Sequence, residues 1–361
     1  MRKCEVTVMR RINRKTLDNL ITYAIVIVAF IACQMMIQSG AMTRSLKGQL
    51  IPICVYIVMA VSLNLTVGIS GELSLGHAGF MSVGAFSGIV ASTWLAAVLP
   101  FENELVRLVL AMAFGGVFAG IAGVIIGIPV LRLRGDYLAI VTLAFGEIIR
   151  NVFNCLYISL DGTRVHIAFN NPSIPGKLVV NGPAGATGVE KIATFTMGFA
   201  LILFTLFVVL NLINSRSGRA IMAIRDNRIA AESMGVNVTK YKLMAFVTSA
   251  VLAGMAGTLY GLNYSTVAAS KFKFDTSILV LVFVVLGGIG NIRGSIIAAT
   301  LLTILPELLR AFADYRMLIY AIVLILVMLV TNNPTMRSLI ERILPHRRKT
   351  DSGSRKEGET A

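Results

Sequence analysis

The side chains that could do chemistry in this chain are few, and they lie far apart in the sequence. The three histidines show no metal-ligand spacing such as HExxH. The four cysteines form no CxxC pair and mostly lie in or beside apolar runs, which favours isolated thiols over disulfides or a metal site. These residues are His77, His166, His346, Cys4, Cys33, Cys54 and Cys155. Because no nucleophile, base and metal set converges, we predict no catalytic and no metal-binding residues, and an enzyme is disfavoured.

Among the polar residues, the charged ones inside apolar runs are the strongest candidates for a functional role. Glu147 lies one helical turn before Arg150, and Glu307 and Arg310 repeat this spacing. A charge within a bilayer costs about 2.5–3.5 kcal/mol on insertion scales, and an i,i+3 ion pair would reduce that cost. Two interpretations stay open, a structural pair near a helix end and a polar contact in a transport pathway. A secondary transporter or channel without ATPase subunits would need these charges for ion coupling.

The composition indicates a membrane protein. Of the 361 residues, 56% are hydrophobic and only 14% are charged, against about 25% charged in ordinary soluble domains. The net charge of +15 lies in short segments that flank apolar runs. Lys and Arg in such places set orientation and contact anionic membrane lipid, so we expect no nucleic-acid partner.

The predicted fold is an all-α integral membrane protein with about ten transmembrane helices, because about 20 apolar residues are needed to cross a bilayer. The span 77–99 and the close pair 276–290 and 294–312 could be re-entrant instead. The ten candidates are 20–38, 50–69, 77–99, 107–130, 137–158, 195–213, 243–262, 276–290, 294–312 and 316–333.

The charge distribution predicts that both termini are cytoplasmic. With ten spans, the cytoplasmic segments hold 22 of the 33 Lys and Arg residues, as the positive-inside rule requires. Residues 1–19 are then a cytoplasmic N-terminal segment and 20–333 the transmembrane domain. The run after the basic start is too long for a signal peptide and is read as a retained helix. The basic tail 334–361 is expected to be disordered.

Two extramembrane segments are long enough to carry structure. The external one, 159–194, contains several turn signals and predicts an ordered loop or cap. The cytoplasmic one, 214–242, has an amphipathic helical pattern that ends near Gly235. It is either a helix lying passively on the bilayer or a coupling helix docked in a partner's groove. The chain has no GxxxxGK[ST] phosphate loop, so any ATPase would be another chain.

Two glycine-rich stretches interrupt the apolar runs, at 69–79 and 286–295. Each is either a tight turn between packed helices or a broken helix that lines a pathway. The pathway candidates are Gly68, Gly71, Glu72, Ser74, His77, Glu147, Gly287 and Gly288. Separate stripes of small residues at 115–123 and 250–257 predict close helix packing, within the chain or against a partner.

Several of these stretches resemble known permeases. Ile229-Ala230-Ala231 followed by Gly235 is similar to the Glu-Ala-Ala-x-x-x-Gly loop of bacterial ABC importer permeases, with Ile229 in place of Glu and without the later Leu-Pro. LNLTVGISGELSLGHAGF (63–80), LRLRGDYLAIVTLAFGE (131–147) and VLGGIGNIRGS (285–295) resemble the branched-chain amino acid permease family. The Leu-Arg-Leu-Arg-Gly stretch points to its LivM-type subunit. At 181–185, Asn-Gly-Pro-Ala-Gly stands where the family usually has Thr-Gly-Gly-x-x-Gly.

The resemblance implies one half of the translocation pathway of an ABC importer in the bacterial plasma (inner) membrane. It implies a heterodimer with a second related permease, two ABC ATPase subunits that carry ATP and Mg, and an extracytoplasmic solute-binding protein. No cofactor is expected on this chain itself. Branched-chain amino acids are the expected substrates, with urea, short amides or other amino acids as alternatives within the family. The expected ATPase-coupling residues are Arg219, Arg225, Asp226, Ala230, Ala231 and Gly235.

Overall fold

The computed structural model describes residues 2–40, 43–98, 103–133, 135–170 and 175–309, with isolated helical positions at 318, 321, 322 and 325. Contacts divide the chain into two units, Met1–Glu307 and Leu308–Ala361. The first unit contains nearly all of the described residues. The second contributes Leu308, which is the last residue of one helix, its neighbour Leu309 and the isolated positions. The predicted span 316–333 therefore lies mostly outside the described residues, and the tail 334–361 lies entirely outside them.

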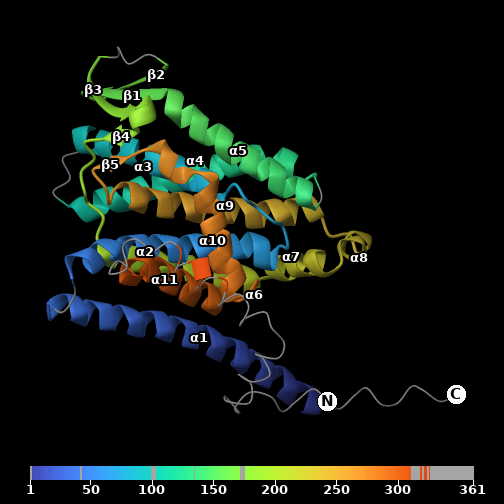
Figure 1. The fold of residues 1–361 in the computed structure, drawn as a ribbon. Coiled ribbons are helices and arrows are strands. Elements are labelled where there is room, and N and C mark those ends of the chain that lie inside the picture. Colours follow the sequence, from blue (N-terminus) through green and yellow to red (C-terminus); the bar gives the residue numbers. More distant parts are fainter. Residues whose placement is uncertain are drawn as a thin grey trace. The chain divides into compact units, whose positions relative to one another are not determined.

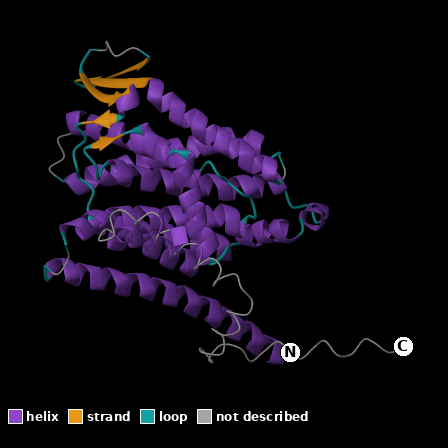
Figure 2. Cartoon of the chain, in the orientation of Figure 1, coloured by secondary structure: helices purple, strands orange, loops and turns teal. Residues whose placement is uncertain are grey.

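Helices dominate the first unit (Figures 1 and 2). Within the described residues, seven helices are long and apolar enough to cross a membrane, and they coincide with the first seven predicted spans. The helices are α1 (Arg2–Gln38), α2 (Arg44–Asn64), α3 (His77–Val98), α4 (Glu104–Val130), α5 (Asp136–Cys155), α6 (Phe195–Asn214), α7 (Arg216–Asp226), α8 (Arg228–Ser233), α9 (Val238–Gly261), α10 (Phe274–Gly287) and α11 (Ile292–Leu308).

The expected spans 276–290 and 294–312 correspond to shorter helices than predicted. α10 has 14 residues, because positive-φ glycines at 288 and 290 end it before the next helix begins. α11 has 17 residues and begins at Ile292, and the last three residues of the predicted span, 310–312, lie outside the described residues. α2 also ends irregularly. It continues as one π-helical turn, η1 (Leu65–Ile69), and the chain then runs without regular structure to His77.

The fold is mostly helical as predicted, but the all-α prediction missed a sheet of five strands at one end of the helical bundle (Figure 2). The strands are β1 (Leu156–Asp161), β2 (Arg164–Phe169), β3 (Lys177–Asn181), β4 (Ala186–Thr187) and β5 (Thr266–Val267), in the antiparallel order β2-β1-β3-β4-β5. β1 takes the last three residues of the expected span 137–158. Their apolar character continues that of α5, so hydropathy alone cannot separate the strand from the helix. In the described parts of the segment 159–194, residues 159–170 and 175–194, the sheet provides the predicted ordered structure.

The core of the bundle is the contact between α3, α4 and α9 (Figure 1). Glycine makes this contact close. A Cβ atom placed on Gly254 would lie 2.7 Å from the carbonyl oxygen of Gly115, and one on Gly115 would lie 2.9 Å from that of Gly84. Thr258 donates a hydrogen bond from its hydroxyl to the Gly84 carbonyl at 2.8 Å. The small-residue stripes therefore pack against helices of the same chain. Of the two alternatives left by the sequence, the structure shows packing within the chain.

Candidate pathway and coupling site

The two glycine-rich interruptions meet in the fold, although more than 200 residues separate them in the sequence. The fully buried Asn64, at the end of α2, accepts a hydrogen bond from the Gly290 amide at 2.8 Å and donates one to the Ser295 hydroxyl at 2.9 Å. Gly68 lies directly against Gly290, because a Cβ on Gly68 would come within 2.7 Å of the Gly290 Cα. We call Asn64, Gly68, Gly290 and Ser295 the glycine junction.

Glycine conformation shapes the second half of this junction. Gly288 and Gly290 both have positive φ, +90° and +82°, which L-residues with a side chain adopt only at a cost. Gly287 packs against the backbone of Gly294 across the turn, so the end of α10 lies close to the start of α11. The predicted pathway residues Gly287 and Gly288 thus form the turn, while Gly290 makes the hydrogen bond to Asn64.

The loop that follows η1 is held from two other helices. The Glu72 carboxylate forms an ion pair with the Lys242 ammonium of α9, and both side chains are largely buried. The Leu75 amide donates to the Thr142 hydroxyl of α5 at 3.0 Å. In contrast, the hydroxyls of Ser70 and Ser74 are buried without a hydrogen-bond partner among the described residues. An orphaned buried hydroxyl is costly, so this loop holds polar groups with unused hydrogen-bonding capacity.

His77, at the start of α3, lies inside the bundle and not in an open channel. Its Nε2 is 2.9 Å from the hydroxyl of Ser62, which itself donates to the Met59 carbonyl. The neighbouring Ala78 amide donates to the Ser277 hydroxyl of α10 at 3.0 Å. These bonds connect the first turn of α3 to both interrupted segments, α2 and α10.

Glu147 forms the predicted ion pair with Arg150, with 2.7 Å between carboxylate and guanidinium. Its other carboxylate oxygen accepts from the Phe274 amide at 3.3 Å, at the start of α10. The pair is therefore satisfied within the chain and also anchors the first turn of α10. Of the second predicted pair, Arg310 lies outside the described residues, and the Glu307 carboxylate accepts a hydrogen bond from Ser45.

The segment 214–242 folds as two short helices, not one. Asn227 ends α7 and caps α8, because its side chain accepts from the Ala230 amide at 3.0 Å. Gly235 has φ +78° and follows α8 in a Schellman motif: its amide bonds the Glu232 carbonyl, and the Val236 amide bonds the Ala231 carbonyl. The predicted C-terminal cap at Gly235 is confirmed.

One face of α7 and α8 packs inward and the other is exposed. Ile221, Ile224 and Ala231 are buried, and the last two form a small apolar cluster with Val238 of α9. Ile229 and Met234 point outward and are 77% and 84% exposed. The amphipathic pattern in the sequence therefore corresponds to a real two-sided unit, whose outer side carries two large apolar residues beside Ala230.

The charged residues predicted in this segment take different places. Arg219 donates to the carbonyl of Asn214, the last residue of α6, at 3.1 Å. Arg225 pairs with Asp226 at 3.0 Å and donates a second hydrogen bond to the Gly68 carbonyl at 2.9 Å. Arg225 thus connects α7 to the glycine junction.

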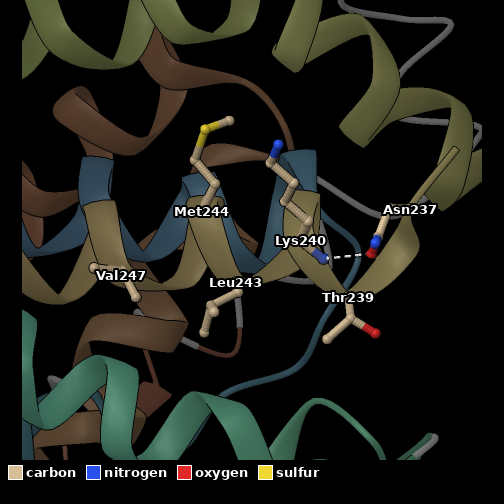
Figure 3. A pocket seen from close by; sticks show the side chains of 6 residues that line it. All are labelled: Asn237, Thr239, Lys240, Leu243, Met244 and Val247. Atoms are coloured by element: carbon tan, nitrogen blue, oxygen red, sulfur yellow. Dashed lines mark hydrogen bonds between the residues drawn. The ribbon is translucent and has the colours of Figure 1, made fainter.

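A shallow groove of about 540 Å³ runs along the first half of α9, immediately after Gly235 (Figure 3). Its lining residues come from a single helix and its cap, with the amide of Lys240 bonded to the Asn237 side chain. They are Asn237, Thr239, Lys240, Leu243, Met244 and Val247. Within the described part of the chain, no three His, Cys, Asp or Glu side chains are placed to hold a metal ion.

Sequence reasoning identified most of the glycine positions in this region but missed their partners. Asn64, Lys242 and Ser277 each make a long-range contact here, and none stands out in the sequence. The available signal was indirect: a polar residue such as Asn64 inside an apolar span needs a partner. Nothing in the sequence named that partner.

Comparison with known proteins gives a consistent result. A family model described as "Branched-chain amino acid transport system / permease component" matches residues 46–329. The high-affinity branched-chain amino acid transport system permease protein LivM of Salmonella typhimurium is 34% identical over 309 residues, covering 76% of this chain and 66% of the relative. The chain thus spans just under two thirds of the length of that relative.

Two further relatives match over a similar part of the chain. The ribose import permease protein RbsC of Escherichia coli K12 is 28% identical over 287 residues, covering 76% of this chain and 81% of the relative. The high-affinity branched-chain amino acid transport system permease protein LivH of Salmonella typhimurium is 26% identical over 283 residues, covering 76% and 89%. No solved structure matches the chain.

Proposed function

Because the chain belongs to the family of permease components of branched-chain amino acid transport systems, we propose that it is one permease subunit of an ABC importer. Members of this family are transport permeases and not enzymes. The seven apolar helices and the relatives make this chain a multi-pass protein of the inner membrane. ATP hydrolysis, with its Mg ion, belongs to two separate ATPase subunits, and an extracytoplasmic binding protein delivers the substrate.

The proposed orientation places α7 and α8 in the cytoplasm and the sheet outside. It is supported by the 22 of 33 Lys and Arg residues that fall in cytoplasmic segments under this topology. α10 is the short, interrupted span of the proposed topology. Its 14 residues span about 21 Å at 1.5 Å per residue, less than the hydrocarbon core of about 30 Å. Its interrupted ends are satisfied by Glu147 and Asn64, as non-helical backbone at membrane depth requires.

Coupling to the ATPase is carried by the outer side of α7 and α8. The observation that supports it is the pair of large apolar side chains, Ile229 and Met234, exposed on an extramembrane helix whose inner face is already packed. Contiguous apolar groups on a solvated surface mark a protein contact. A short helix presenting them fits a hydrophobic groove in the partner, the mode of helix-in-groove recognition.

The substrate pathway lies between this chain and a second, related permease. α5 supports this placement, because Asn151, in the C-terminal part of a predicted span, is exposed on the same side as Ile148 and Val152. A polar side chain that faces lipid is costly, so this side of α5 faces protein or water. Glu147, which is partly exposed on α5, would then be the charged group nearest to the pathway.

Branched-chain or related amino acids are the proposed substrates. The relative named LivM shares more identity with the chain than the relative named a ribose import permease. Because both kinds of permease match the chain, the family alone does not select the substrate, and the binding protein would carry most of the specificity.

The test of the coupling surface is co-purification of ATPase subunits with the tagged chain. Replacing both Ile229→Ser and Met234→Ser is expected to weaken the retained ATPase about tenfold or more, because each truncated anchor at an interface typically costs above about 1 kcal/mol. The matched control is Val165→Ser with Ile167→Ser, a pair of exposed apolar residues on β2 at the sheet end. Normal ATPase retention in the Ile229 and Met234 variant contradicts the coupling surface. Uptake driven by an ion gradient with no ATPase bound contradicts the importer.

A further inference from the structure

The carbonyl of Gly68 is one of the last acceptors of an interrupted helix. In η1 the hydrogen bonds widen, with the Ser70 amide bonding the Leu65 carbonyl and the Glu72 amide bonding the Thr66 carbonyl. The chain then turns away at Gly71, which has φ +75°. Carbonyls at such a helix end need partners from outside the helix. For Gly68 that partner is the Arg225 guanidinium, whose Nη1 donates to it at 2.9 Å.

The Arg225 side chain also fits this place sterically. Its Cγ lies where a side chain at position 71 would begin, because a Cβ on Gly71 would be 2.7 Å from it. A cation at the C-terminal end of a helix is favoured by the helix dipole. The contact therefore combines a charge-assisted hydrogen bond, a favourable dipole and a close fit against glycine.

Gly68 connects this contact to the second interrupted segment. Gly68 lies against Gly290, and Asn64, one turn earlier, holds Gly290 and Ser295 by two hydrogen bonds. This series of contacts begins at Arg225 on α7 and ends at the turn between α10 and α11. The described contacts thus run without interruption from the coupling segment to both broken helices.

We propose that Arg225 is the positioning residue that transmits movement of the coupling segment to the glycine junction, through the Gly68 carbonyl. The proposal rests on the proposed function, since it assumes an ATPase that moves α7 and α8. It goes beyond a docking role, because it assigns Arg225 to an internal contact and Ile229 and Met234 to the ATPase contact. A displacement of α7 would then change the end of α2 and the α10–α11 turn together.

The test uses the complete complex with its ATPases and binding protein in proteoliposomes. Arg225→Gln is expected to lower ATP-driven uptake about tenfold, within the range of ordinary coupling free energies, while ATP hydrolysis stays close to the wild-type rate. Arg225→Lys keeps one charged donor and is expected to recover part of the uptake. The matched control is Arg216→Gln, an exposed arginine in the first turn of the same helix.

A distance measurement separates transmission from a general structural effect. Spin labels at Leu73→Cys and Ile289→Cys, two exposed positions beside the junction, are placed in a chain lacking its native cysteines. ATP trapping is expected to shift their distance in the wild type and in Arg216→Gln, but not in Arg225→Gln.

The outcomes distinguish the two proposals. Uptake and distance shift unchanged in Arg225→Gln would overturn the link while leaving the importer intact. Uptake and ATP hydrolysis that fall in proportion would also overturn it, because Arg225 would then serve ATPase docking. A wild-type complex with no ATP-driven uptake would overturn the importer, and the link with it.

Discussion

In the α3–α4–α9 core, the lack of a side chain at glycine lets helix backbones come into contact. In the glycine junction, glycine lets a helix end and the chain change direction. Gly84, Gly115 and Gly254 lie within regular helices and face one another. Gly288 and Gly290 have positive φ and lie between helices. The same residue type therefore makes one region tightly packed and the other locally non-helical.

This difference determines what each region can do. Backbone-to-backbone packing has no alternative arrangement close in energy, since any shift creates voids or overlaps. The junction is held by a few side-chain hydrogen bonds, from Asn64 and Arg225, which can break and re-form singly. A permease needs a fixed part and a part with two arrangements, and the two regions supply these different properties.

Alanine substitutions test this comparison, and Gly84→Ala is expected to have the largest effect on stability. Its new methyl group would overlap the backbone of Gly254, which no side-chain rotation can relieve. Overpacking of a core typically costs about 1–3 kcal/mol and more when backbone must move. We expect a lower melting temperature and less monodisperse protein by size-exclusion chromatography in detergent.

The control for this variant is Gly48→Ala in α2, where a Cβ meets open space. It should be neutral or gain up to about 1 kcal/mol from the better helix propensity of alanine. A Gly84→Ala protein as stable as Gly48→Ala would show that the core is not tightly packed.

Gly68→Ala is expected to have a smaller effect on stability and a larger effect on transport. Its methyl group would displace the Asn64 side chain and press on Gly290, which leaves the Gly290 amide unpaired at a cost of about 1–3 kcal/mol. Uptake in proteoliposomes should be lost while the protein still purifies as a folded species. Uptake at the wild-type rate would remove the glycine junction from the transport mechanism.

Gly235→Ala is expected to have the smallest effect on stability. A Cβ at this position meets no atom within 4 Å, so the penalty comes only from φ +78° and amounts to about 1 kcal/mol. Because the Schellman motif orients α8, we expect ATP-driven uptake to fall more than the melting temperature does. Gly235→Asn, which tolerates the left-handed conformation, should restore uptake. Equal impairment in both variants would mean that backbone conformation is not the cause.

The sequence predicted the helical part of the fold well, because hydropathy over 20 residues reports directly on membrane spans. It failed at Leu156–Asp161, where an apolar strand continues an apolar helix without a polar break. The glycine stretches were recognised as interruptions, and the amphipathic segment as a two-sided unit. The break at Asn227 was not predicted, since its side chain acts as a cap that only the backbone geometry reveals.

The contacts within the site were the least predictable part. Asn64 is one polar residue at the end of an apolar span, and its partners Gly290 and Ser295 belong to the last quarter of the chain. The Glu72–Lys242 pair likewise joins residues with no sequence pattern between them. Such contacts depend on how helices pack in three dimensions, and periodicity along one helix carries no information about a distant partner.

The pairing of β4 with β5 has a consequence for biosynthesis. β1, β2 and β3 are close in sequence and can pair before the rest of the chain is made, but β5 follows α9. The pairing of Val267 with Ala186 therefore forms only after α6 and α9 have been synthesised. The sheet closes late, between the synthesis of α9 and that of α10, and this non-local pairing is a slow step of the kind that limits folding.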